Sequence, residues 1–322
     1  AAAPVSPKTT AAADLIAGAP GFDSTSGSTA VNDVGAVFVI FGSTTLGKTI
    51  DLANTAASYT VTGTLAGGEI GTTLAVGNFN GDNLSDFAIG APLASSNEAK
   101  GSGAVYLALG SEGLAGTKNI SQASSLMLTG AEGDSLGTSL AMGDLNGDGR
   151  ADLILSAANA SAPGTSRSKV GAVYVVYGAA TLQNRSADLT VYGAGANNDE
   201  FPDALGKTLT VGDFNGDGIA DLAIGAPGAD NTDSKRDPIG SVYVIFGARS
   251  GLTGIYDLAT KAADWTALGA DSGDHLGEAA IAIANINASE PADVILGIPK
   301  GKSLNNLRTD AGELRIIYGA RR

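Results

Sequence analysis

The stretch DFNGDGIADLAIGAP, residues 213–227, decides the fold of this chain. Its first half places side-chain oxygens at the first, third, fifth and ninth positions, which are Asp213, Asn215, Asp217 and Asp221. Reversing a chain takes only one or two Asn, Asp or Gly residues. An alternating set of carboxylate and amide oxygens instead directs several ligands at one centre, as proteins do to hold Ca²⁺ at roughly 2.3–2.6 Å. The intervening glycines let the backbone wrap tightly enough for the carbonyl of Ile219, at the seventh position, to join them.

The flanks of this loop distinguish it from an EF-hand. An EF-hand places a bidentate Glu at the twelfth position and a helix on each side. Here the twelfth position is Ile224, within an apolar run, and Asp221 at the ninth position closes the site. Residues 209–211 and 222–224 are short and strand-like. The stretch therefore predicts a calcium-binding hairpin between two β-strands.

Related stretches recur along the chain. Two further copies of the whole loop read GDLNGDGRADLILSAA at residues 143–158 and GNFNGDNLSDFAIGAP at residues 77–92. They predict two more calcium loops, with the ligand sets Asp144, Asn146, Asp148, the Arg150 carbonyl and Asp152, and Asn78, Asn80, Asp82, the Leu84 carbonyl and Asp86. A degenerate copy at residues 284–299 offers only Asn287, Ser289 and Asp293, so calcium is not expected there. The first copy, AAADLIAGAP at residues 11–20, keeps only the second half.

Two other blocks accompany the loops in constant order. One precedes four of the copies and reads EIGTTLAVG, SLGTSLAMG, ALGKTLTVG and HLGEAAIAI. The other follows all five and reads GAVFVIFG, GAVYLALG, GAVYVVYG, GSVYVIFG and GELRIIYG. Pro20 and Pro92 are 72 residues apart, as are Pro227 and Pro299. The regular spacing of these blocks indicates tandem structural repeats.

Each repeat predicts four short strands: the block before the loop, the apolar run after it, the GAVYVVYG-type block and a weaker fourth segment. The fourth segment falls at residues 58–63, 125–130, 188–193 and 265–269. No segment shows a sustained 3.6-residue period, so little helix is expected. Four-stranded units in tandem are typical of the antiparallel blades of a β-propeller, with a β-solenoid as the alternative. We expect one all-β domain over residues 1–322, with repeats at about 1–63, 64–130, 131–193, 194–269 and 270–322, of which the first and last are incomplete.

Composition narrows the class of protein. Hydrophobic residues make up 43% of the 322 residues, which is enough for a large core. The formal net charge of −14 argues against nucleic-acid binding, which needs a basic surface. No apolar run is long enough to span a bilayer. Cysteine is absent, which excludes disulfides, thiolate metal sites and cysteine nucleophiles.

The pattern LG…SLA…GDxNGDGxxDLxIGAP, followed by GAVYVxFG, resembles the FG-GAP repeat of integrin α-subunit propellers and of bacterial secreted integrin-like proteins. The resemblance covers nearly the whole chain, except about ten residues at its start. It implies calcium in the hairpin loops on one face of a ring, and partners bound on the opposite face. Family members usually close about seven blades. Because five copies are visible here, a five-blade ring and part of a larger ring both remain open.

Single residues offer little chemistry outside the loops. His275 is the only histidine and stands where other repeats have Ser135 or Glu69, so we interpret it as a surface turn residue. Trp265, the only tryptophan, lies in a predicted fourth strand and is expected to pack between blades. A glycosidase would need two carboxylates facing each other across a cleft. The candidates, in the connections opposite the calcium hairpins, are Asp23, Asp33, Asp230, Asp233, Asp237 and Asp310.

These observations lead to a functional hypothesis. We expect a calcium-binding module that is not an enzyme and that is secreted or held at the cell surface. It would serve adhesion or assembly by binding a protein or a surface glycan through the face opposite the calcium loops. The alternative is an accessory or catalytic domain of a secreted hydrolase, or a propeller lectin. We expect no nucleic-acid partner, no membrane span and no cofactor other than Ca²⁺.

The two incomplete repeats leave strand edges to be paired. The first copy enters at its second strand, residues 14–16, and the last copy stops after its third strand, residues 314–318. An exposed strand edge is a template for pairing. We therefore expect either that a five-blade ring closes imperfectly or that a strand from a neighbouring chain or missing segment completes the last repeat.

Overall fold

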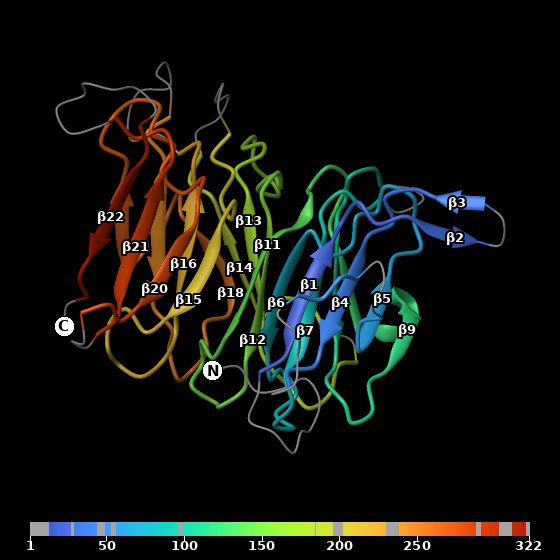
Figure 1. Cartoon of the computed structure of the whole chain (residues 1–322). Helices are drawn as coiled ribbons and strands as arrows, with labels where there is room; N and C mark the ends of the chain where they lie inside the picture. The colour runs from blue at the N-terminus through green and yellow to red at the C-terminus, as the bar shows by residue number, and fades with distance from the viewer. Residues whose placement is uncertain are drawn as a thin grey trace. The chain divides into compact units, whose positions relative to one another are not determined.

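The computed structural model describes residues 13–26, 29–43, 49–52, 56–95, 99–183, 185–195, 202–229, 238–287, 291–302 and 311–319. The chain divides into two compact units, residues 1–140 with 178–185, and residues 141–177 with 186–322. Within the described ranges nearly all regular structure is β-strand, and the one helix is α1 (Ile120–Ala123) (Figure 1). No helix in those ranges is long and apolar enough to cross a membrane. The prediction of an all-β fold with little helix is confirmed.

The first unit contains two four-stranded sheets, which correspond to the first two repeats. The first sheet has the order β1-β4-β5-β9 and consists of β1 (Leu15–Ala19), β4 (Ala36–Ile40), β5 (Tyr59–Thr62) and β9 (Gly116–Asn119). The second has the order β10-β8-β7-β6 and consists of β6 (Thr73–Gly77), β7 (Asp86–Ala91), β8 (Ala104–Ala108) and β10 (Leu126–Thr129). A small hairpin of β2 (Ser24–Ser26) and β3 (Thr29–Val31) lies in the connection between β1 and β4.

The remaining three repeats form three sheets. The third repeat has the order β11-β12-β13-β14-β18, with β11 (Leu136–Gly143), β12 (Asp152–Ala157), β13 (Ala172–Val176), β14 (Leu189–Tyr192) and β18 (Gly254–Asp257). The fourth has the order β15-β16-β17-β19, with β15 (Leu209–Gly212), β16 (Asp221–Ala226), β17 (Ser241–Ile245) and β19 (Trp265–Leu268). The fifth has the order β20-β21-β22, with β20 (Ile281–Ala284), β21 (Asp293–Ile298) and β22 (Glu313–Ile317).

The apolar run after each complete loop forms the most buried strand of its sheet. Every residue of β7, β12 and β16 is buried, because strands pair on both sides and side chains cover both faces. The antiparallel register continues into the GAVYVVYG-type block, where Leu153 pairs with Val176 and Leu222 with Ile245. All four predicted strands are present in the second, third and fourth repeats. These sheets confirm the propeller-type blades that the repeats predict.

Two strands depart from the predicted four-stranded antiparallel pattern. β9 and β18 precede the fourth strands of the second and fourth repeats, and each adds in parallel to the outer strand of the preceding repeat, β5 or β14. The sequence does not predict these two strands, because GTKN in β9 and GIYD in β18 are too short to show an alternation of apolar and polar residues. In the second unit Arg167, which is 8% exposed, anchors β18. Its guanidinium pairs with Asp257 and donates to the Gly193 carbonyl oxygen at 2.7 Å.

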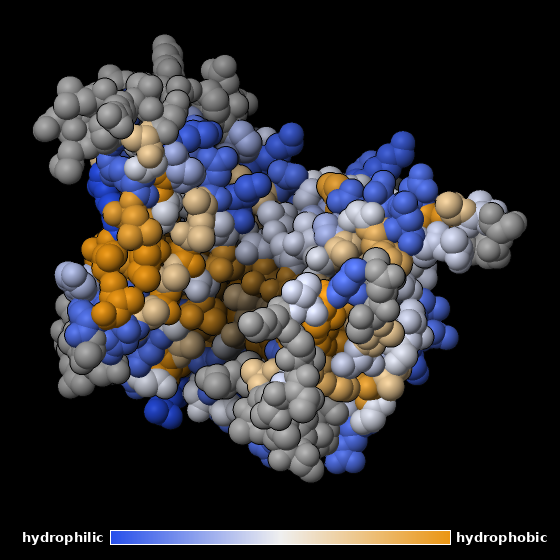
Figure 2. Space-filling view, viewed as in Figure 1, coloured by the Kyte–Doolittle hydropathy of each residue, from blue (hydrophilic) through white to orange (hydrophobic). Residues whose placement is uncertain are grey.

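Among the described residues the first and last repeats are incomplete, as predicted, and the first sheet reaches four strands only by adding β9. Strand β1 corresponds to the second strand of a full repeat, and β22 corresponds to the third. Among the described residues β22 pairs with β21 alone, in a register that places Ile316 opposite Ile295. Apolar side chains gather on the surface over β21 and β22 (Figure 2). Within the described ranges β22 is thus an edge strand, which agrees with the predicted strand register of the last repeat.

Candidate functional site

The three predicted calcium loops are tight hairpin loops within the sheets. They join β6 to β7, β11 to β12 and β15 to β16, and each begins where the first strand ends. In two of them the closing aspartate pairs across the hairpin with the glycine before the loop, Gly77 with Asp86 and Gly212 with Asp221. This register brings the first and ninth positions of the loop close together, as a single ligand centre requires.

In the 213–221 loop the alternating side chains turn inward and bond to the backbone of the loop itself. Asp213 accepts hydrogen bonds from the amides of Gly216, Asp217 and Gly218 at 2.7, 3.1 and 2.9 Å. Asn215 Oδ1 accepts from the Asp217 amide at 2.9 Å. Gly216 and Gly218 have φ of 78° and 83°, which glycine adopts without steric cost. The first and third side chains are therefore drawn toward the interior of the same turn.

The ninth residue, Asp221, is fully buried and ties the loop to the end of the third strand. Its Oδ2 accepts from the amides of Phe214 and Asn215 at 2.8 and 3.0 Å, and its Oδ1 accepts from the Gly247 amide at 3.0 Å. Burial raises the pKa of this carboxyl to about 6, and the charge of Asp217 also raises it, while the backbone hydrogen bonds oppose the shift. The protein alone thus compensates the charge of Asp221 poorly, and a bound cation would improve that balance.

The 144–152 loop repeats this arrangement. Asp144 accepts from the amides of Asp148 and Gly149 at 3.1 and 2.8 Å. Asp148 Oδ1 accepts from the Arg150 amide at 2.8 Å. One difference lies in the seventh residue, because the Arg150 guanidinium is 3.6 Å from the Asp148 carboxylate. A ligand carboxylate of this loop therefore already has a cationic neighbour.

The 78–86 loop keeps the same turn with one carboxylate fewer. Asn78 Oδ1 accepts from the amides of Gly81 and Asp82 at 2.8 and 3.2 Å, in the place of Asp213. Asn83 stands where the other loops have glycine and adopts a φ of 70°, a left-handed conformation that Asn tolerates. Burial also raises the pKa of the closing Asp86.

The donor set of these loops fits a hard cation such as Ca²⁺. Each loop offers carboxylate and Asn oxygens from alternate residues, and its seventh residue adds a backbone carbonyl oxygen. In the part of the chain that the structure describes, however, no three Asp, Glu, His or Cys side chains converge as a metal cluster. The loops would therefore bind through mixed carboxylate, amide and backbone oxygens, and calcium remains a prediction.

The closing aspartate has a structural role that sequence reasoning missed. In the degenerate loop Asp293 is also fully buried, and its Oδ2 accepts from the Ile286 amide at 3.1 Å. The glycine after the third strand donates its amide to the closing aspartate in four repeats, in the pairs Gly42–Asp14, Gly110–Asp86, Gly247–Asp221 and Gly319–Asp293. The sequence signal was an aspartate before the apolar run in all five copies, including the two that lost the rest of the loop.

Two candidates outside the loops take part in the fold. His275 has a φ of 50°, close to the 48° of Glu69 and the 56° of Ser135, so it fills a left-handed turn position before the first strand. The Trp265 indole packs edge-on against Phe214, with the ring centroids 5.3 Å apart. The turn position of His275 agrees with its interpretation, and Trp265 also packs against an apolar cluster that the fourth and fifth repeats share, as expected.

Only two of the six carboxylates considered for acid–base chemistry lie in the described ranges. Asp23 Oδ1 accepts a hydrogen bond from the Asp33 amide at 2.8 Å, which braces the connection between β1 and β4. The other four, and one side chain of the degenerate loop, lie outside the described residues: Asp230, Asp233, Asp237, Asp310 and Ser289.

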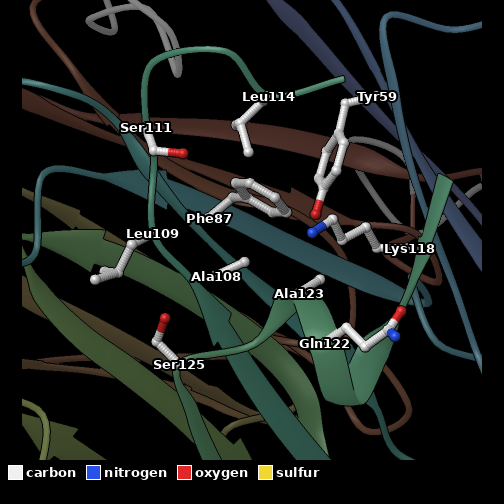
Figure 3. A pocket seen from close by; sticks show the side chains of 10 residues that line it. All are labelled: Tyr59, Phe87, Ala108, Leu109, Ser111, Leu114, Lys118, Gln122, Ala123 and Ser125. Atoms are coloured by element: carbon white, nitrogen blue, oxygen red, sulfur yellow. The ribbon is translucent and has the colours of Figure 1, made fainter. Parts of the chain in front are cut away.

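A pocket of about 310 Å³ opens in the first unit, at the end of β7 that carries the 78–86 loop (Figure 3). Phe87, Leu114 and Tyr59 give it apolar walls, and the Tyr59 hydroxyl points toward the amino group of Lys118. Burial raises the pKa of Tyr59. None of the ten lining residues is acidic, in a chain with 33 Asp and Glu residues. The pocket therefore suits a small ligand that carries an anionic group.

Comparison with known proteins links this geometry to a family. The FG-GAP repeat model matches residues 70–107, 136–176 and 205–245. The chain is 30% identical over 194 residues to the phosphatidylinositol-glycan-specific phospholipase D of Dictyostelium discoideum. This alignment covers 56% of this chain and 19% of that protein. The chain is 34% identical over 173 residues to that of Bos taurus, with 51% and 18% covered. Integrin alpha-PS2 of Drosophila melanogaster is 31% identical over 186 residues, with 56% and 12% covered.

These relatives correct one expectation from the sequence. The prediction that the chain is not an enzyme is wrong, because curated relatives at 30% to 39% identity are named as an enzyme, phosphatidylinositol-glycan-specific phospholipase D. The error arose because the prediction weighed only motifs within this chain, and the repeats dominate its sequence. The aligned part is about a fifth of the length of the phospholipase D relatives.

The family assignment rests on motif and architecture together. The three matched segments begin at the block before each complete loop and end in the GAVYVVYG-type strand, so they coincide with the antiparallel core of the second, third and fourth repeats. Integrin alpha-PS5 of Drosophila melanogaster is also similar to this chain, at 36% identity over 121 residues. The chain is therefore an FG-GAP repeat protein with integrin-like propeller blades.

Proposed function

We propose that this chain is the FG-GAP portion of a hydrolase of the phosphatidylinositol-glycan-specific phospholipase D type. The observation that carries the proposal is the similarity of more than half of the chain to two such proteins, at 30% and 34% identity. On this proposal the sheets form a rigid scaffold that holds a phosphatidylinositol-glycan for hydrolysis. The first-unit pocket supports it, because the Lys118 ammonium and the Tyr59 hydroxyl would receive an anionic phosphate group.

We also propose that the three complete loops hold Ca²⁺. The support is the donor set and the raised pKa of Asp221, a buried carboxyl that a cation would hold in its charged form. The ion would supply positive charge, while the residues of this chain orient the oxygens through their bonds to loop amides. Asp213, Asn215 and Asp217 would do this in the 213–221 loop.

A second candidate function is adhesion outside the cell. It is favoured by the 31% identity to integrin alpha-PS2 over 186 residues. The partner would be a protein or a surface glycan, bound by the connections at the opposite end of each sheet from the calcium loops. An extracellular or cell-surface location belongs to both candidate functions. Pairing of a neighbouring chain with the edge of β22 that no described strand occupies also belongs to this proposal.

The test uses the full chain and vesicles that carry a phosphatidylinositol-glycan-anchored reporter. We expect the chain to co-sediment with these vesicles or to release the reporter, and to do neither with phosphatidylcholine vesicles. Lys118→Ala should weaken the effect several-fold, and Lys100→Ala, at an exposed lysine of the same unit, should not. Absence of both binding and release would refute the hydrolase proposal. Retention of a protein partner by the same inactive chain would favour adhesion.

A further inference from the structure

The pocket of the first unit has a counterpart inside the second unit. Both lie beneath an insertion that joins the third strand of a repeat to its fourth strand. The insertion of the second repeat reads GSEGLAGTKNI, and that of the fourth repeat reads GARSGLTGIYDL. Their strands β9 and β18 add in the same register, with Lys118 opposite Val61 and Tyr256 opposite Val191. Lys118 and Tyr256 therefore occupy equivalent positions.

The counterpart in the second unit is filled by its own side chains. Tyr256 is 4% exposed and belongs to the same apolar cluster as Ile245. Its hydroxyl donates to the Ala262 carbonyl oxygen at 2.5 Å. The Tyr177 hydroxyl donates to the Leu252 carbonyl oxygen and accepts from the Leu252 amide, both at 2.6 Å. Two tyrosines thus bind the insertion to the sheet, and their hydroxyls are satisfied by backbone groups.

The first unit carries different residues at these positions. The counterparts of Ile245 and Tyr256 are Ala108 and Lys118, in the same register of their sheets. A methyl group and a flexible lysine replace two large apolar side chains. Phe41 stands in the place of the tyrosine that binds the insertion, and it has no hydroxyl with which to do so. These replacements explain why a space of about 310 Å³ is open here.

Two polar groups are directed into this space. Tyr59 is 3% exposed, yet its hydroxyl points into the pocket toward the amino group of Lys118 (Figure 3). Within the described ranges this hydroxyl has no hydrogen-bond partner and Lys118 has no carboxylate partner. Burial raises the pKa of Tyr59, so the hydroxyl keeps its proton and can donate it to a ligand. A buried donor and an ammonium group at one cavity indicate an anionic ligand.

The rest of the lining indicates what the anionic group is attached to. Ser111 and Ser125 add hydroxyl groups and Gln122 adds an amide, which suit a ligand with several hydroxyls. The rings of Tyr59 and Phe87 offer apolar surfaces for the C–H face of a ring. The volume is at the small end of the range of about 300–1,000 Å³ for ligand pockets. One ring with a phosphate group fits such a space, whereas a pair of acyl chains does not.

We infer that this pocket binds a phosphorylated cyclic polyol. The Lys118 ammonium and the Tyr59 hydroxyl hold the phosphate group, and the polyol ring lies against Phe87. This class follows from the pocket, while the choice of inositol as the polyol rests on the proposed function. For a phosphatidylinositol-glycan, the pocket would hold the phosphorylated headgroup and leave the acyl chains outside.

The first test is calorimetric titration of the full chain with myo-inositol 1-phosphate. We expect myo-inositol and inorganic phosphate each to bind at least about tenfold more weakly, because each keeps only part of the contacts. Inorganic phosphate that binds as tightly as the inositol phosphate would overturn the inference, since the site would then recognise no polyol. Absence of binding by myo-inositol 1-phosphate would overturn it as well.

Four variants locate the binding in this pocket. Lys118→Met keeps an unbranched side chain without charge and should weaken binding at least about tenfold, and Tyr59→Phe should weaken it about three- to tenfold. Ala108→Ile restores the residue of the filled counterpart and should abolish binding with both polar groups still present. Lys100→Ala should bind like the parent chain. Denaturant unfolding checks that each variant folds. Unchanged affinity in folded Lys118→Met and Tyr59→Phe would overturn the inference.

Vesicles distinguish a lipid headgroup from a free ligand. We expect the chain to co-sediment with phosphatidylinositol vesicles and soluble myo-inositol 1-phosphate to displace it. Vesicle binding that the soluble ligand cannot displace would overturn the inference, because the pocket would not hold the headgroup. Reporter release without any binding of the soluble ligand would overturn it and leave the hydrolase proposal standing. Soluble binding with neither binding to nor release from the reporter vesicles would support the pocket and refute the hydrolase proposal.

Discussion

The 213–221 loop and the 285–293 loop occupy the same place in neighbouring sheets, and they differ in what they have kept. The first has carboxylates at positions one, five and nine, whereas the second has only the ninth, Asp293. Both closing aspartates are fully buried and accept the same pair of backbone contacts, one from the loop and one from the glycine after the third strand. The difference separates two functions of one motif. The ninth carboxylate braces the sheet in both loops, and only the 213–221 loop keeps the earlier carboxylates that the calcium proposal needs.

Removing calcium should have the largest effect, because it acts on all complete loops at once. Binding to the native state adds on the order of 3 kcal/mol for each site at a hundredfold excess over the Kd. EDTA should therefore lower the melting temperature by several degrees, and added Ca²⁺ should restore it. If neither EDTA nor added Ca²⁺ changes the melting temperature, the 213–221 loop binds no more calcium than the degenerate loop does.

Asp293→Ala should have the next largest effect, although its loop holds no predicted ion. The change leaves the partly buried amides of Ile286 and Gly319 without their acceptor, at a cost of about 1–2 kcal/mol of unfolding free energy. Denaturant unfolding should show the same loss in calcium and in EDTA. A loss seen only in calcium would mean that this aspartate is a ligand rather than part of the sheet.

Asp217→Ala tests the earlier positions of the 213–221 loop, which the degenerate loop has lost. Asp217 lies on the exposed side of its loop and accepts only from Asn215 and from the Ile219 amide, so the apoprotein should lose about 1 kcal/mol or less. In calcium the loss should be larger, because one ligand carboxylate is gone. The check is the difference between melting temperatures in calcium and in EDTA, which should shrink relative to the parent chain. An unchanged difference would remove Asp217 from the ligand set.

Arg150→Gln should produce the smallest change. The guanidinium lies 3.6 Å from Asp148, and both side chains are more than a third exposed, so the pair contributes only a few tenths of a kcal/mol. Without this cation the 144–152 loop should bind calcium up to a few-fold more tightly, which calorimetric titration can detect. Weaker binding would show that Arg150 supports the loop instead of competing with the ion.

Much of the fold could be read from the sequence because it is repeated. The weak fourth strand at residues 265–269 would not stand alone, yet its place after the GSVYVIFG block identifies it as β19. The loop turns were predictable for the same reason, since alternating oxygens and glycines admit few backbone paths. Because the pattern recurs, several copies independently predict the same local structure.

The sequence could not predict contacts that occur only once or that join two repeats. β9 and β18 are each four residues long, and their pairing with β5 and β14 depends on residues of another repeat. The structural role of the closing aspartate left one signal, its presence in all five copies, but the backbone amides that it binds cannot be identified from sequence. The pocket of Tyr59 and Lys118 combines an outer strand with an inserted one, so no local motif encodes it.

The parallel additions also set the order in which this chain can fold. In most tandem arrays each repeat contacts only its neighbours, and folding can begin at any repeat and propagate. Here the sheet of the first repeat gains its last strand, β9, only when most of the second has been synthesised, and β18 stands in the same relation to the third repeat. We therefore expect a pair of repeats, rather than a single repeat, to be the cooperative folding unit. In a nascent chain the edge of β5 would stay unpaired until β9 is synthesised. Because unpaired strand edges promote aggregation, we expect a chaperone to matter most during that interval.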